Sequence, residues 1–173
     1  MWVALTFNKL VAARNNVREA WAQIDVQLAQ RSDLVPQLVA AVEGYQAHER
    51  EALEAVVAAR TQMVNAQGPR AAGEADTVLE GALGKLYALA EAYPDLKANT
   101  NFLDLQARLT ALEEDIASAR RYYNALVERF ATLRQSFPNV IIAGPLGFRA
   151  AEYFKAEGDD RSTPSVAGET ATS

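Results

Sequence analysis

The chain has 173 residues, half of them hydrophobic, with a formal net charge of −5 and an isoelectric point near 5.0. This length suits one domain with a substantial core, whereas the acidic charge argues against binding to nucleic acid or electrostatic attachment to anionic lipid, which both need positive charge. The absence of cysteine excludes disulfides, thiolate catalysis and cysteine-ligated metals.

The N-terminal apolar run is short, because it covers only residues 1–7 before Asn8 and Lys9. A helix that spans a bilayer needs about 20 apolar residues. The run also lacks the charged start and the cleavage site of a signal peptide. We therefore expect the chain as given not to cross a membrane.

From Phe7 onward, apolar residues recur at intervals of three or four residues, as one face of an α-helix requires. Arg14 stands where this stripe predicts an apolar side chain. Its guanidinium either reaches solvent from the edge of the face or is held between helices by an Asp or Glu. The stripe consists of Phe7, Leu10, Val17, Trp21, Ile24 and Leu28.

Pro36 marks a joint in this first helical region. A proline inside a helix removes one hydrogen bond and clashes with the preceding turn, but it is tolerated in the first turn of a new helix. With Asp33 as the N-cap, the pattern predicts a break near residues 30–32 and a reversal into a second helix. One kinked helix running through Pro36 is the alternative.

Three further helical segments complete the predicted fold. The second helix ends before Gln67-Gly68-Pro69, a strong stop signal, and we expect a loop at residues 68–74. A third, shorter helix ends at Pro94. A fourth runs from about Asn101, a plausible N-cap, to about Ser136, with apolar residues in an unbroken heptad pattern. The prediction is an all-α fold, an antiparallel four-helix bundle with long coiled-coil-like helices, whose core includes Trp21, Tyr45 and this fourth-helix seam.

Residues 140–148 are apolar and are interrupted by Gly and Pro. We interpret them as a loop that folds back over the end of the bundle; the alternative is an exposed apolar patch for a partner or a membrane surface. Residues 149–155 are expected to add one helical turn. Small and polar residues predict a disordered tail over residues 156–173.

The chemistry-bearing residues are few. His48 is the only histidine, so the two Glu-x-x-His motifs of a ferritin-like dimetal site cannot form, and we expect no metal, cofactor or catalytic residue. Asp25 is a candidate partner for Arg14, Arg18 or Arg31 in a polar network between helices. The acidic run 113–115 is interpreted as an outer face with helical ion pairs.

The order of several motifs closely resembles the LemA family from about residue 7 to residue 154. The resemblance implies a bacterial helical domain, usually tethered by one N-terminal transmembrane helix, with a poorly defined molecular role and no catalytic residues to transfer. It suggests residues 1–7 as the remnant of that membrane helix, 8–155 as the LemA-like domain, and a location at the cytoplasmic face of the membrane. The motifs are Phe7-Asn8-x-Leu10-Val11-x-x-Arg14-Asn15-x-Val17-x-x-Ala20-Trp21-x-x-Ile24-Asp25-Val26-Gln27-Leu28, Arg31-x-Asp33-Leu34-Val35-Pro36-x-Leu38-Val39, Gly44-Tyr45-x-x-His48-Glu49, Tyr93-Pro94-Asp95-Leu96-Lys97-Ala98-Asn99, Asn101-Phe102, Ala119-Arg120-x-x-Tyr123-Asn124 and Phe137-Pro138-Asn139-Val140-Ile141-Ile142-Ala143.

The sequence is compatible with three functions. The first is a non-enzymatic interaction or scaffold protein with an unknown protein partner. The second is a ligand-binding protein or enzyme with a polar pocket near Arg14, Asp25 and His48, which a deep buried cluster of these groups would favour. The third is a self-assembling coiled-coil protein, which light scattering at several concentrations would test.

Overall fold

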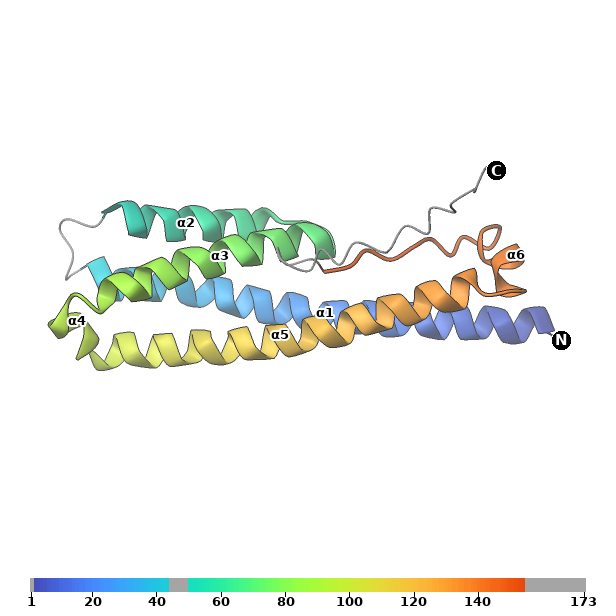
Figure 1. Ribbon diagram of the computed structural model, residues 1–173, viewed down its shortest axis with the longest axis horizontal. Coiled ribbons are helices and arrows are strands. Elements are labelled where there is room, and N and C mark those ends of the chain that lie inside the picture. The colour runs from blue at the N-terminus through green and yellow to red at the C-terminus, as the bar shows by residue number, and fades with distance from the viewer. Residues whose placement is uncertain (1, 44–49, 155–173) are drawn as a thin grey trace, which may run out of the picture.

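The computed structural model describes residues 2–43 and 50–154, and over these residues it is all-α, with no strand in either range (Figure 1). This confirms the all-α part of the predicted fold. The predicted tail at 156–173, and the candidates Tyr45 and His48, lie outside the described residues. The helices are α1 (Trp2–Glu43), α2 (Arg50–Asn65), α3 (Gly68–Ala90), α4 (Pro94–Lys97), α5 (Thr100–Gln135) and α6 (Asn139–Ala143).

The two longest helices form the spine of the molecule. Helix α1 has 42 residues and α5 has 36, and the two pack side by side over much of their length (Figure 1). Helices α2 and α3 pack on one another and lie along one half of this spine. The other half is accompanied by α6 and by a non-helical segment, residues 148–154, which we call the C-terminal strap.

The core is made where the apolar stripes of these helices meet. The heptad pattern predicted for the fourth helix runs on to Phe137, which lies beyond α5 and is 82% exposed. Most of the buried face of α5 comes from this pattern, namely Phe102, Leu105, Leu109, Ile116, Tyr123 and Phe130. Trp21 is half-buried, with its ring 6.0 Å from Tyr123 and 6.3 Å from Phe154. Trp21 thus packs against the core from its edge, at the contact between α1, α5 and the strap.

The sequence interpretation was wrong at Pro36. Helix α1 continues from Trp2 to Glu43, so the reversal predicted near residues 30–32 does not occur and the alternative, one helix running through, is right. A proline cannot donate to the carbonyl four residues earlier, which here belongs to Ser32. The Arg60 Nε on α2 donates a hydrogen bond to this carbonyl oxygen at 2.8 Å. A neighbouring helix therefore satisfies the acceptor that Pro36 leaves free.

Other helix boundaries also differ from the prediction. The expected loop at 68–74 is the first part of α3, whose Pro69 stands in the first turn, where a proline fits without losing a bond. Asn99, rather than Asn101, caps α5, and its side chain accepts a hydrogen bond from the Phe102 N–H. The turn of helix expected at residues 149–155 is not formed over 149–154.

The C-terminal strap is fastened to α5 by side chains that bond its backbone. The Asn124 amide pairs with both backbone groups of Phe154: its Nδ2 donates to the Phe154 carbonyl and its Oδ1 accepts from the Phe154 N–H, both at 3.0 Å. The Tyr123 hydroxyl donates to the Glu152 carbonyl at 2.7 Å. These bonds replace a helical or strand ladder, which explains how a non-helical segment can bury Phe154 to 1% exposure.

Candidate functional site

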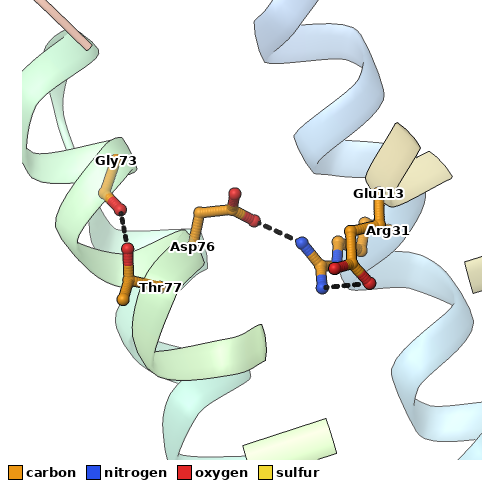
Figure 2. Close-up of polar contacts among 5 residues, drawn as sticks. All are labelled: Arg31, Gly73, Asp76, Thr77 and Glu113. Carbon is orange, nitrogen blue, oxygen red and sulfur yellow. Dashed lines mark hydrogen bonds and ion pairs between the residues drawn. The ribbon is translucent and has the colours of Figure 1, made fainter. Parts of the chain in front are cut away.

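A buried ion cluster joins three helices in the half of the molecule that contains α2 and α3. Arg31 of α1 is 1% exposed, and its Nη1 lies 2.7 Å from Oδ1 of Asp76 on α3. Its Nη2 lies 3.9 Å from Oε2 of Glu113 on α5. Figure 2 shows the guanidinium between the two carboxylates. One cation thus links α1 to α3 and to α5.

Burial decides the electrostatics of this cluster. It raises the pKa of the Asp76 carboxyl above its ordinary value, and the Arg31 charge opposes the rise. It raises the pKa of Glu113 in the same way, again opposed by Arg31 and reinforced by the nearby Glu80. It also raises the pKa of Tyr87 to about 12. Burying an ion pair costs desolvation free energy that good geometry can only partly return, so the cluster is better suited to fixing helix register than to adding stability.

An open hollow of about 560 Å³ lies beside the cluster, between α3 and α5. Glu80, Tyr87, Glu113 and Arg120 are among its lining residues. The Tyr87 hydroxyl is buried and has no hydrogen-bond partner among the described residues. The groups lining the hollow offer polar contacts to a molecule that enters it.

The predicted polar residues do not converge on one site. Arg14 is half-buried, and its guanidinium lies over the Phe148 ring, 5.2 Å from the ring centroid. Asp25 is exposed and lines a separate hollow of about 280 Å³ between α1, α2 and α3. Arg31 is in the ion cluster, with Asp76 and Glu113 as its partners rather than Asp25. His48 lies outside the described residues.

Sequence reasoning did not predict Asp76 and Glu113 as site residues, although the sequence contains a pattern that indicates a buried ion pair. Asp76 falls three residues before Leu79 on the apolar face of α3, so it occupies a core position of that stripe. Arg31 lies three residues after Leu28 and four residues before Val35 on α1, so it also occupies a core position. Glu113 belongs to the run interpreted as an outer face, but it is only half-exposed and faces Arg31. Opposite charges at core positions of two stripes indicate a buried pair.

A second feature is an exposed apolar surface at the opposite end of the spine, which we call the apolar end. Residues 140–148 were predicted to form a loop, but residues 140–143 are helical as part of α6. The segment is only partly buried: Ala143 and Phe148 are in the core, and Phe148 packs edge-on against Phe7 with ring centroids 5.6 Å apart. The surrounding large apolar side chains stay exposed. They are Trp2, Val3, Leu5 and Phe7 of α1, together with Phe137, Val140, Ile141 and Leu146.

Comparison with known families identifies the chain. The sequence model of the LemA family matches residues 20–167, most of the chain. The chain belongs to the LemA family. The resemblance inferred from its motifs is thereby confirmed.

Individual relatives of this LemA-family chain share modest identity with it. Protein LemA of Metamycoplasma hominis is 23% identical over 155 residues, which cover 89% of this chain and 71% of the relative. Magnetosome protein MamQ 2 of Paramagnetospirillum magneticum is 32% identical over 88 residues, 51% of this chain and 32% of the relative. Magnetosome protein MamQ of Magnetospirillum gryphiswaldense is 32% identical over 87 residues, 49% of this chain and 32% of the relative. The aligned region is about a third of each magnetosome relative.

In the described part of this LemA-family chain, no helix combines the length and the hydropathy needed to span a bilayer. Helix α1 is long enough at 42 residues, but charged side chains such as Lys9, Arg14 and Arg18 interrupt it from its second turn onward.

Proposed function

We propose that this LemA-family chain is a non-enzymatic interaction protein, a four-helix antiparallel scaffold held at the periphery of a bacterial membrane with its domain on the cytoplasmic side. The molecule would act by displaying surfaces to a protein partner rather than by transforming a substrate. The family resemblance supplies the membrane placement, and the arrangement of the side chains supports the scaffold role.

The observation that carries this proposal is that eight of the fifteen exposed large apolar side chains among the described residues gather at one end of the molecule. Inside, apolar side chains from α1, α2, α3 and α5 fill the space between the helices, and the cluster at Arg31 is closed by its own carboxylates. Outside, large apolar side chains gather at the apolar end. Exposed apolar surface of this kind commonly marks a site of interaction.

The alternative of a ligand-binding or catalytic pocket near Arg14, Asp25 and His48 receives less support. The Arg14 guanidinium lies over the Phe148 ring, whereas Asp25 lines the hollow between α1, α2 and α3. A reaction centre needs its acid, base and orienting groups within hydrogen-bond reach of one another or of one substrate. The separation of Arg14 and Asp25 gives no such arrangement.

The two functions can be separated by purification from native membranes. A tagged protein, extended upstream of residue 1 to include any membrane helix, is solubilised in mild detergent and examined by native mass spectrometry. The scaffold proposal predicts a stoichiometric protein complex that persists in a variant combining Arg14→Gln, Asp25→Asn and His48→Gln. Loss of a bound small molecule in this variant, with no protein partner in the wild type, would instead support the pocket and overturn the scaffold.

A further inference from the structure

We propose that the apolar end of the molecule seats on an anionic lipid bilayer, with α6 and the turn after it entering the interface beside the first turns of α1. This deepens the proposed placement at the membrane periphery and rests on it. It adds a second membrane contact, at α6, which is far in the chain from the first turns of α1. It also specifies that the lipid is anionic.

The apolar side chains of this surface come from two segments that pack on each other. Helix α6 packs on both α1 and α5, and the contact of Phe7 with Phe148 ties the turn after α6 to α1. Both segments lie at the same end of the molecule (Figure 1). On the α6 side, Phe137 is 82% exposed, Ile141 is 62% exposed and Val140 is 50% exposed. Side chains of this size facing water at the tip of a long rod are placed to enter an apolar phase end-on.

Charge identifies what covers this surface. The whole chain carries −5, yet residues 2–18 and 129–151 contain no Asp or Glu. None of the basic residues in these two ranges forms a salt bridge with a described residue. Elsewhere in the described residues, five basic side chains do so with Asp or Glu, namely Arg31, Arg50, Arg70, Lys97 and Arg108. The unpaired basic residues are Lys9, Arg14, Arg18, Arg129, Arg134 and Arg149.

A surface of apolar side chains with a surrounding set of unpaired cations matches the interface of an anionic bilayer, where lipid headgroups supply negative charge above an apolar interior. A second copy of the chain fits less well, because docking two such ends together would bring like charges into proximity. The acidic net charge of the whole chain suggested no attraction to anionic lipid. Attraction between charges decays within a Debye length of about 8–10 Å, however, so the charge close to the bilayer matters more than the net charge. The positive charge is concentrated at this end.

Vesicle binding by the 173-residue chain tests the proposal. Sedimentation with phosphatidylcholine vesicles, with and without phosphatidylglycerol, should show binding to the anionic vesicles that weakens with added salt. Ile141→Asp should lower the partition coefficient by about tenfold or more, because it removes apolar area from the interface and adds a repelled charge. Combined Arg134→Gln and Arg149→Gln should lower it by about fivefold for each cation lost.

The matched control is Val64→Asp on α2, since Val64 is 61% exposed and Ile141 is 62% exposed. This control should leave vesicle binding unchanged apart from the general effect of one added charge. Circular dichroism of both variants should match the wild type, because both positions are at the surface. Equal losses from the two substitutions would show that net charge, and not the apolar end, controls binding, and would overturn the proposal.

A fluorescent reporter identifies which segment enters the interface. Because the chain has no cysteine, Ile141→Cys and Val64→Cys can each be labelled at one site with an environment-sensitive dye. The proposal expects a blue shift at position 141, and none at position 64, when anionic vesicles are added. Binding without a shift at 141 would leave α1 as the contact and overturn the role of α6.

Two further outcomes also contradict the proposal. Equal binding to neutral vesicles would remove the role of charge, and an absence of binding together with concentration-dependent dimerisation would make a second copy the occupant. Neither result bears on the partner complex from native membranes. A scaffold with a partner but without this lipid contact, and a lipid-binding end without a partner, are therefore distinguishable.

Discussion

Different structural elements pack against the two halves of the spine formed by α1 and α5. In the half with α2 and α3, other helices cover α1 and α5, and the one deeply buried cation, among the described residues, meets carboxylates from two of them. In the other half, α6 and the strap accompany the same two helices, large apolar side chains face outward, and cations have no ionic partner among the described residues.

This contrast separates residues that hold the fold from residues available for binding. A buried charge without a partner costs several kcal/mol, so the covered half has to pair its buried cation, Arg31, with carboxylates of its own. An exposed cation costs little when unpaired, so the exposed Lys9, Arg18, Arg129 and Arg149 of the other half can keep their positive charge for another molecule. Substitutions in the first half should therefore change the free energy of unfolding, whereas exposed positions at the apolar end should change binding.

Substituting Arg31 should have the largest effect on the free energy of unfolding among the changes that test this comparison. Arg31→Ala should lower the free energy of unfolding by about 3–5 kcal/mol, because it leaves the Asp76 carboxylate buried without its partner. The pair Arg31→Met and Asp76→Leu should recover most of this loss, since apolar side chains of similar size remove both desolvation costs. Urea unfolding followed by circular dichroism measures both.

The matched control is Arg108→Ala, which removes a cation paired with Asp104 at 3.0 Å on the exposed face of α5. This change should cost no more than about 0.5 kcal/mol. A loss at Arg31 as small as the control's would mean that water reaches the cluster and that the covered half is not closed.

The bond from Arg60 to the Ser32 carbonyl should have the next largest effect. Arg60→Met keeps the aliphatic part of the side chain but leaves the buried carbonyl without a donor, which should cost about 1–3 kcal/mol. With Pro36→Ala in place, the restored N–H can donate to the same carbonyl, so Arg60→Met should then cost much less. A double-mutant cycle on urea unfolding measures this coupling, and additive losses would show that Arg60 does not replace the missing helical bond.

The same bond explains where sequence reasoning failed on the fold. Periodicity correctly predicted an all-α fold and most of the buried face of α5, because both depend on residues close together in the chain. The break at Pro36 was inferred from bonds within one helix, whereas the replacement donor, Arg60, comes from another helix 28 residues away. Neither Pro36 nor its neighbours in sequence carry information about that donor.

The candidate site was predictable only in part, for a related reason. Arg31 was selected and is central to the ion cluster, but its partner Asp76 is 45 residues away and depends on how α3 packs against α1. Asp25 was a candidate partner for Arg14, Arg18 or Arg31, yet Arg14 contacts Phe148 and Asp25 is exposed. The basic character of the apolar end was hidden because the net charge sums over the whole chain.

In the half with the strap, Asn124 should be the main polar determinant of stability. Asn124→Ala removes the partners of the Phe154 N–H and carbonyl, which should lower the free energy of unfolding by about 1–3 kcal/mol and expose residues 148–154 to hydrogen exchange. Mass spectrometry of exchanged peptides measures the second effect. The control Asn15→Ala, at an exposed position of α1, should change stability by less than about 0.5 kcal/mol. Unchanged exchange in Asn124→Ala would show that Phe154 burial alone holds the strap.

The smallest expected effect is a dependence of the free energy of unfolding on pH, caused by the titration of Glu113. Burial raises the pKa of Glu113 in the folded state above the ordinary value of 4.5, so the folded chain binds this proton more tightly than the unfolded chain does. The corresponding stability is fully present below pH 4.5 and is lost as the pH rises through the folded-state pKa. Glu113→Gln fixes a neutral side chain and should escape this loss.

The wild type should therefore lose stability relative to Glu113→Gln as the pH rises from about 4 to 7, as urea unfolding at several pH values would measure. Glu114→Gln, at the neighbouring exposed position, is the matched control for removing one negative charge from α5. The same pH trend in both variants would assign the effect to the overall charge of the helix. A trend confined to Glu113→Gln would assign it to burial beside Arg31 and Glu80, the feature that distinguishes the covered half from the apolar end.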